Sequence, residues 1–186
     1  MKKIAILQSN YIPWKGYFDI INLVDEFILY DDMQYTRRDW RNRNKIKTPD
    51  GLKWLTIPVV NKGKFFQKIN ETQVQNSEWC HDHWRALSLN YARAPYFRQY
   101  AERIEGLYRQ CEQETYLSKI NYRFLTAICE MLDIHTKITW SSDYELAEGK
   151  TERLVGLCHS AGGSEYLSGP AAKDYIEDSL VEGAGI

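Results

Sequence analysis

The N-terminal part of the chain contains two short apolar segments, each followed at once by a loop rich in polar and aromatic residues. The segment KKIAILQ, from Lys2, predicts a β-strand, followed by the loop SNYIPWKGYF and an amphipathic helix over 17–26. The segment FILYDD, from Phe27, predicts a second strand and leads into MQYTRRDWRNRNKIK. Strands that alternate with helices are typical of α/β proteins with a parallel sheet. Loops at the carboxyl ends of such strands meet at one edge, so we expect a ligand site there.

The later segments continue this pattern but include a long helical stretch. We therefore predict a single α/β domain over 1–186, with three layers, a mostly parallel sheet and a helical insertion over about 77–132. The final residues, LVEGAGI, predict a turn into a further strand and suggest a chain that stops short of its natural end. The other predicted elements are a strand over 51–60, a short strand in FFQKINETQVQ, helices over 78–93 (with Ser77 as N-cap), 96–112, 116–132 and 151–161, a strand in HTKITWSSD, and a strand, loop and helix in SEYLSGPAAKDYI, with the helix starting at Ala171.

Composition restricts the class of protein. The chain has 186 residues and a formal net charge of −1, which argues against nucleic-acid binding by the surface as a whole. The first apolar run covers only 4–7, too short for a signal peptide, and no segment approaches the roughly 18 apolar residues of a membrane helix. Four cysteines without a CxxC pair predict reduced thiols. We expect a cytoplasmic protein with no membrane partner.

Two carboxylates, Asp31 and Asp32, stand at the end of the second predicted strand. One of them is suited to hold a sugar hydroxyl, to accept a proton or to help bind Mg²⁺, since all three tasks need a carboxylate at the ligand edge. The alternative is that both cap the following turn.

A basic run follows, with six Lys and Arg between Arg37 and Lys47 and only Asp39 to offset them. Guanidinium groups bind phosphate through two parallel hydrogen bonds, so Arg38 and Arg43 are candidate phosphate contacts. A solvated cationic face and a strip that binds single-stranded nucleic acid by charge and stacking are the alternatives.

Other motifs are weaker. Trp14 belongs to a rigid loop between the first strand and the first helix, and is either an aromatic wall of the site or a core residue. Ser168 and Gly169 precede a predicted helix and, with Lys173, predict an anion site or an ordinary capped turn. In CHDH the spacing of the histidines does not suit a metal site, so His83 either packs or lines the cleft.

Several separated motifs together resemble the WbqC-like proteins, a family named from bacterial O-antigen gene clusters. They are QSNYIPWKGYF, FILYDDMQYTRRDWRNRNKIK, KWLTIPV, HWRALSLNYARAPYF and YLSGPAAKDYI. The resemblance runs through nearly the whole chain, although family members usually continue past a segment like VEGAGI. It implies a role in surface-polysaccharide synthesis and a likeness to nucleotidyltransferase-like, Rossmann-like sheets, which is an analogy of fold.

We therefore expect an enzyme that modifies a nucleotide-linked amino sugar by acyl or aminoacyl transfer. Asp31 or Asp32 would orient or deprotonate the acceptor amine, with His83 as a reserve base and no metal at the site. An ATP- and Mg²⁺-dependent adenylating or nucleotidyl-transferring enzyme and a non-catalytic nucleic-acid-binding protein are the alternatives. The predicted substrate contacts are Gln8, Asn10, Tyr11, Trp14, Gln34, Tyr35, Arg38, Asn42, Arg43, Ser168, Gly169 and Lys173.

Overall fold

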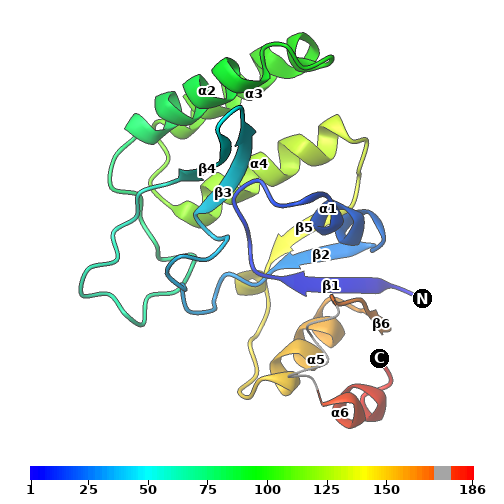
Figure 1. Ribbon diagram of the computed structural model, residues 1–186. Helices are drawn as coiled ribbons and strands as arrows, with labels where there is room; N and C mark the ends of the chain where they lie inside the picture. The colour runs from blue at the N-terminus through cyan, green and yellow to red at the C-terminus, as the bar shows by residue number, and fades with distance from the viewer. Residues whose placement is uncertain (170–176) are drawn as a thin grey trace. The chain divides into compact units, whose positions relative to one another are not determined.

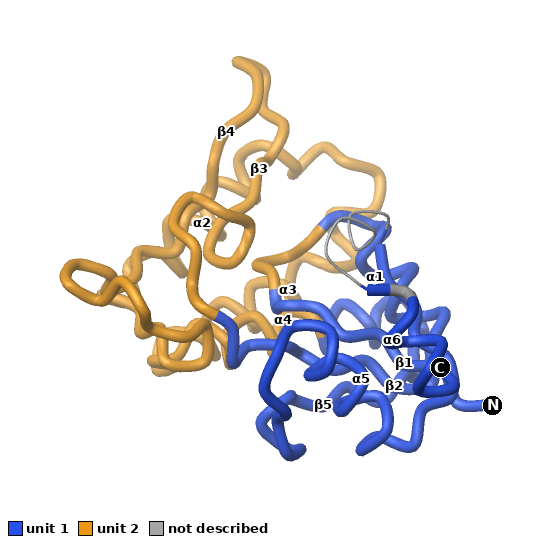
Figure 2. The backbone as a smooth tube through the Cα atoms, turned by 90° about the horizontal axis from the view of Figure 1, so that it is seen from below, with its two compact units in different colours: residues 1–9, 14–33, 126–186 blue, residues 10–13, 34–125 orange. Residues whose placement is uncertain are grey.

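The computed structural model describes residues 1–169 and 177–186, and these residues form two compact units (Figure 2). Unit 1 consists of 1–9, 14–33 and 126–186, and unit 2 of 10–13 and 34–125. Unit 1 therefore takes in both ends of the chain and unit 2 its middle. The organisation of 1–186 as a single domain stays a prediction.

Unit 1 is built on a four-stranded parallel sheet with the order β5-β2-β1-β6. The short apolar segments of the sequence form its central strands, because strands buried on both faces are continuous apolar runs. This confirms an α/β protein with a parallel sheet. The strands are β1 (Lys3–Leu7), β2 (Glu26–Leu29), β5 (Lys137–Trp140) and β6 (Glu165–Tyr166).

Helices cover both faces of this sheet. Ile4, Ile6 and Ile28 pack against α5 (Thr151–Ser160) on one face. On the other face the ring of Phe27 lies 5.3 Å from that of Tyr17 in α1 (Lys15–Asn22), measured between centroids. The alternation of side chains along β1 and β2 explains the two faces, and the result is a three-layer arrangement. Figure 1 shows α5 and, beyond it, α6 (Asp178–Gly183) on the same side of β1. A short 3₁₀ turn, η1 (Ser141–Asp143), follows β5.

Unit 2 combines an antiparallel hairpin with helices. The hairpin is β3 (Arg43–Thr48) and β4 (Gly51–Thr56), and Gly51 has a φ of 107°, which suits glycine at this tight turn. Its core gathers buried aromatic side chains, among them Tyr11 and Tyr108. The helices are α2 (Glu78–Tyr91), α3 (Phe97–Cys111) and α4 (Leu117–Met131), which fall in the predicted helical stretch; the boundary between the units lies within α4.

Some predicted boundaries are wrong. The first helix ends at Asn22 rather than 26, because Glu26 already pairs in the sheet as the first residue of β2. The strand expected over 51–60 ends at Thr56, shortly before Pro58, which has no N–H for a ladder. Ser77 stands at the N-cap of α2, but its side chain makes no capping hydrogen bond.

Other differences concern whole elements. Within the described residues, the segment FFQKINETQVQ forms only isolated bridges, such as that between Gln34 and Lys68, instead of a strand. The final residues form α6 where a turn into a strand was expected, so that prediction is wrong. The helix predicted to start at Ala171 falls on 170–176, outside the described residues.

Candidate functional site

The carboxyl edge of the sheet in unit 1 collects polar side chains from loops that are far apart in the sequence. All four strands are parallel, so the residues after Leu7, Leu29, Trp140 and Tyr166 leave at the same edge (Figure 1). The chain order of the strands reverses beside β1, where β6 lies on the side opposite to β2. Such a reversal point is where open α/β sheets bind ligands. The structure thus brings six predicted site residues to this edge of unit 1: Gln8, Trp14, Asp31, Asp32, Ser168 and Gly169.

Asp31 fixes the loop after β1. The residue is 1% exposed, and its carboxylate accepts a hydrogen bond of 2.8 Å from the backbone N–H of Ser9. The hydroxyl of Tyr17 donates to the carbonyl oxygen of Gln8 at 2.9 Å. Both contacts hold the main chain of this loop, and Gln8 itself is half-buried. A catalytic role for Asp31 stays a prediction.

Asp32 is the more accessible carboxylate of the pair. It is half-buried, and the hydroxyl of Ser141, directly after β5, donates a hydrogen bond to it. Tyr30 and Arg153 also lie in this region. Burial raises the pKa of the Tyr30 phenol, and the positive charge of Arg153 and a hydrogen bond from its guanidinium partly offset that rise. Sequence analysis missed Tyr30, Ser141 and Arg153, because no motif marks them and only the parallel register brings them to Asp32.

Trp14 supplies an exposed aromatic surface at the start of α1. Its side chain is 69% exposed, and its indole lies over Gly16, where an added Cβ would come within 2.0 Å of the ring. Because Gly16 has no side chain, the indole can lie against this position without a steric clash. The sequence left two interpretations of Trp14, an aromatic wall of the site or a core residue. The second is wrong, because a core tryptophan would not be exposed to this degree.

The late loop lies beside β1. The backbone N–H of Leu167 donates to the carbonyl of Ile4 at 2.8 Å, and the half-buried Ser168 and Gly169 follow directly. The predicted anion contact Lys173 lies outside the described residues.

The predicted site residues of unit 2 fall into three places, and the first is its core. Tyr11 is 1% exposed, and its hydroxyl lies 2.9 Å from Nδ1 of His83 and 2.6 Å from the hydroxyl of Tyr108. Asn10 accepts a hydrogen bond from Arg41. These contacts and this burial account structurally for Tyr11 and His83, whose roles in binding and as a reserve base stay predictions.

His83 is held neutral in this core. Burial lowers its pKa to about 4, although a hydrogen bond to the backbone of Thr56 acts in the opposite direction. That bond raises the pKa, so the backbone group is an acceptor and the ring nitrogen donates to it. Nδ1 is then left to accept a hydrogen bond from the Tyr11 hydroxyl.

The second place is a pocket of about 380 Å³ on unit 2, to which Gln34 and Tyr35 contribute. Arg37 lines this pocket and donates a hydrogen bond to the carbonyl of Asn61 at 2.8 Å. Gln34 donates to the carbonyl of Phe65, also at 2.8 Å. The sequence indicated the first wall of this pocket, but not the second, which comes from 61–65 some 25 residues later. Its lining is Gln34, Tyr35, Thr36, Arg37, Asn61, Lys64 and Phe65.

The third place is the β3–β4 hairpin and the loop before it. Arg38 is exposed with a φ of 60°, and its carbonyl accepts a hydrogen bond from Arg43. The guanidinium carbon of Arg43 lies 4.1 Å from the centre of the Trp54 ring. Asn42 is buried and donates to the carbonyl of Ile57 at 2.8 Å, which joins this loop to the chain after β4.

The cysteine thiols are buried and unpaired. Burial raises the pKa of Cys80, Cys111 and Cys158 to about 12 and that of Cys129 to about 11. The thiolate is the nucleophilic form, so these groups are inert near neutral pH.

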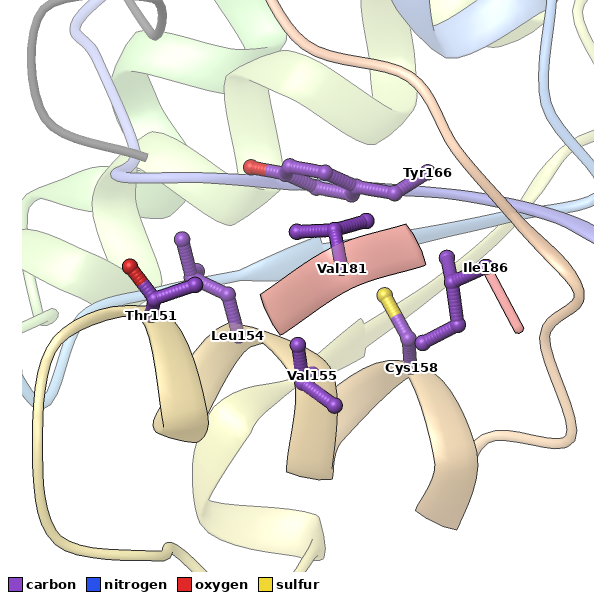
Figure 3. Close-up of a pocket in the computed structure, with 7 residues that line it drawn as sticks. All are labelled: Thr151, Leu154, Val155, Cys158, Tyr166, Val181 and Ile186. Atoms are coloured by element: carbon purple, nitrogen blue, oxygen red, sulfur yellow. The ribbon is translucent and has the colours of Figure 1, made fainter. Parts of the chain in front are cut away.

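A pocket between α5 and α6 does not supply a ligand site. Figure 3 shows apolar side chains, including Leu154, Val181 and Ile186, facing one another beside the ring of Tyr166. It has no space for a water molecule. It is a packing seam between the two helices.

The described part of the chain contains no group of three His, Cys, Asp or Glu side chains placed to hold a metal ion. None of the helices in 1–169 and 177–186 is long and apolar enough to cross a membrane.

Together these features define a three-layer α/β protein with a parallel sheet and with polar side chains gathered at the carboxyl edge of that sheet. The profile of the WbqC-like protein family matches residues 8–186. The uncharacterized protein Rv1507c of Mycobacterium tuberculosis (strain ATCC 25618 / H37Rv) is 56% identical over 182 residues, which are 98% of this chain and 78% of that protein. The chain belongs to the WbqC-like protein family. No solved structure is significantly similar to it, so the likeness to nucleotidyltransferase-like sheets stays a prediction.

Proposed function

We propose that this protein is an enzyme of surface-polysaccharide synthesis that transfers an acyl or aminoacyl group to the amino group of a nucleotide-linked sugar. The observation that carries the proposal is the strand order β5-β2-β1-β6, whose reversal beside β1 lies next to the loops of Gln8 and Ser168. Crevices at such points accommodate nucleotides in many α/β enzymes. Membership of the WbqC-like family supports the link to polysaccharides through the family's name alone.

The exposed indole of Trp14 suits the planar or apolar part of such a substrate. An aromatic ring stacks on a base or on the apolar face of a sugar, and Gly16 leaves room for the indole to lie flat on the first turn of α1. The hydroxyl of Ser168 and the guanidinium of Arg153 add a hydrogen-bond donor and a positive charge at the same edge for phosphate.

Asp32 is the proposed general base. When the amine nitrogen attacks the acyl carbon, a C–N bond forms, the bond to the leaving group breaks with its electron pair, and the nitrogen must lose a proton. The carboxylate of Asp32 accepts that proton, while its hydrogen bond from Ser141 holds it in one orientation. Asp31 keeps the adjacent loop in place through Ser9.

Direct transfer between the two bound substrates suits this site better than an acyl-enzyme on cysteine. The four thiols are buried and protonated, as their raised pKa values indicate. Holding amine and acyl donor together supplies the rate by proximity and orientation.

The test combines a thermal-shift screen with one variant. Nucleotide sugars are screened first, since a ligand at about 100 times its Kd stabilises a protein by about 2.7 kcal/mol. With the sugar that shifts the melt, transfer from acyl-coenzyme A and from aminoacyl donors is followed by mass spectrometry. Asp32→Asn should bind the nucleotide sugar within about twofold of the parent and lose on the order of 100-fold in transfer rate.

The matched control is Asp133→Asn, an exposed aspartate that contacts His135 in the turn before β5, at the opposite edge of the sheet. Its φ of 58° is one that asparagine tolerates well, so the fold should not change. The proposal fails if no nucleotide sugar shifts the melt, or if Asp32→Asn and Asp133→Asn transfer equally well.

A further inference from the structure

The β3–β4 hairpin of unit 2 has one buried and one exposed face. Directly paired residues share a face, so the register of Lys45 with Trp54 and Lys47 with Leu52 puts them all on one side. The other side carries Ile46 and Leu55, which are 8% and 5% exposed and belong to the core. We call the exposed side, formed by Arg43, Lys45, Lys47, Leu52, Trp54 and Thr56, the hairpin face.

The cations of the hairpin face are not neutralised. Among the described residues, no carboxylate forms an ion pair with Arg43, Lys45 or Lys47. The surrounding chain is also basic: residues 34–68 contain ten Lys and Arg against two Asp, although the whole chain has a net charge of −1. Such local concentration of one charge produces a field that attracts polyanions.

Aromatic rings stand among these cations. Trp54 is 39% exposed, and Lys45 Nζ and the guanidinium carbon of Arg43 lie 4.6 and 4.1 Å from its ring centre. Trp40, 47% exposed, adds a second ring with its centroid 5.4 Å from that of Trp54. Two exposed tryptophans are unusual on a solvated surface, where aromatic groups normally mark interaction sites.

From these features we propose that the hairpin face, together with Trp40, binds single-stranded nucleic acid. Residues two apart on a strand are about 6.6–6.8 Å apart, so Arg43, Lys45 and Lys47 form a regular row of charges that can follow successive phosphates. The rings offer surfaces on which bases stack, which an acidic peptide would not use. This binding is separate from the sugar-modifying activity, and it assigns Arg43 to the phosphates of a polymer.

Charge complementarity decides between this occupant and an apolar one. Three unpaired cations in a row are costly to bury against an apolar protein surface but are matched by a phosphate backbone. Because the rings lie among the cations, one strand can be held by charge and by stacking at the same time.

The experiment measures fluorescence anisotropy of labelled oligouridine and oligothymidine of about 15 nucleotides with the full chain, over a series of salt concentrations. Affinity should fall with salt, with a slope of about −0.7 for each phosphate contacted. Arg43→Gln/Lys45→Gln/Lys47→Gln should reduce that slope by about 2 and weaken binding at least about tenfold in 0.1 M salt. Trp54→Leu should weaken binding by about tenfold through lost stacking. The RNA and DNA arms show which polymer is preferred.

The control triple variant, Arg85→Gln/Arg93→Gln/Arg98→Gln, removes the same charge from exposed positions in and between α2 and α3. Circular dichroism and Tm establish that both triple variants fold. The proposal is overturned if the control weakens binding as much as the hairpin variant, or if neither oligonucleotide binds at low salt. It is equally overturned if polyglutamate or anionic lipid vesicles bind as tightly. Displacement of the oligonucleotide by a nucleotide sugar would place the face in the substrate site and contradict a separate function.

Discussion

At the scale of single residues, one buried histidine decides how unit 2 responds to acid. The ring of His83 is packed against Tyr11 and Trp79, with centroids 5.6 and 5.3 Å away, and burial lowers its pKa to about 4. In the unfolded chain the pKa of histidine is about 6.5. Between these values the unfolded state binds a proton that the folded state does not, so stability must fall as the pH falls from about 6.5 to about 4.

His83→Gln should reveal this contribution in the pH dependence rather than in stability at one pH. The parent should lose about 2 kcal/mol of unfolding free energy between pH 7 and pH 5 through His83. The variant should not show this loss, because glutamine does not titrate. Urea unfolding at both pH values measures the two losses. The exposed His81→Gln, on the same helix, is the control and should behave like the parent. Equal losses in parent and His83→Gln would mean that His83 has the same pKa in the folded and unfolded states, which would contradict the lowered pKa.

Sequence analysis identified candidate residues better than it identified the residues that contact them. It selected Asp31 and Asp32 because they follow an apolar strand, and the structure places both at the carboxyl edge. It could not separate them, because the contacts that do so come from Ser9 and Ser141, which are 22 and 109 residues away in the chain. Tyr11 was selected from the loop after the first strand, and His83 was expected either to pack or to line the cleft. That the two side chains meet in one buried core could not be predicted, because their contact joins positions 72 residues apart.

At the scale of elements, Glu26 joins strands and loops at the amino edge of the sheet. It is the first residue of β2 and fully buried. Lys2 and Lys137 donate to its carboxylate at 2.7 and 3.1 Å, and Thr139 at 2.9 Å. Burial alone would raise the pKa of this carboxyl, but these bonds and one from Tyr144 outweigh it and hold the pKa at about 2. Such a group stabilises the fold above the unfolded pKa of about 4.5, and its contribution is lost as the pH falls towards 2.

Glu26→Gln should therefore destabilise the protein by an amount that shrinks in acid. The expected loss of unfolding free energy is about 3 kcal/mol at pH 7 and about 1 kcal/mol at pH 3. It is smaller at pH 3 because the ionised carboxylate of the parent then contributes less to stability. Urea titrations at the two pH values give both numbers. Glu165→Gln is the matched control, since Glu165 pairs with Lys3 at 3.4 Å on a partly exposed part of the same sheet and should cost about 1 kcal/mol or less. A cost for Glu26→Gln that is independent of pH would contradict the lowered pKa.

Elements with a clear pattern of apolar residues were predictable, and those whose ends depend on tertiary contacts were not. The apolar runs of β1 and β2 and the amphipathic α4 were predicted within a few residues. The first helix was predicted to continue to Glu26, whereas pairing with β1 makes Glu26 the first residue of β2. The end of the chain was expected as a turn into a further strand, but Leu180 and Val181 belong to α6, where Val181 faces α5. Tertiary contacts decided both cases.

At the scale of the molecule, the two units depend on different titrating groups. Unit 2 contains His83, which weakens its unit below about pH 6.5, and unit 1 contains Glu26, which weakens its unit only below about 4.5. At pH 5 the contribution of Glu26 is nearly complete, while about 2 kcal/mol has been lost at His83. Mild acid should therefore act on one unit before the other.

Hydrogen exchange followed by mass spectrometry tests this order. Between pH 7 and pH 5, after correction for the intrinsic rates, slowly exchanging amides of α2 and α3 should lose protection by about thirtyfold, which corresponds to about 2 kcal/mol. Amides of β1 and β2 should change by less than about twofold. In His83→Gln the difference between the units should disappear, since the group that causes it is gone. An equal loss of protection in both units of the parent would contradict this order and show that they open as one cooperative body. A proton taken up by His83 on unfolding would then destabilise the sheet of unit 1 as much as α2 and α3 of unit 2.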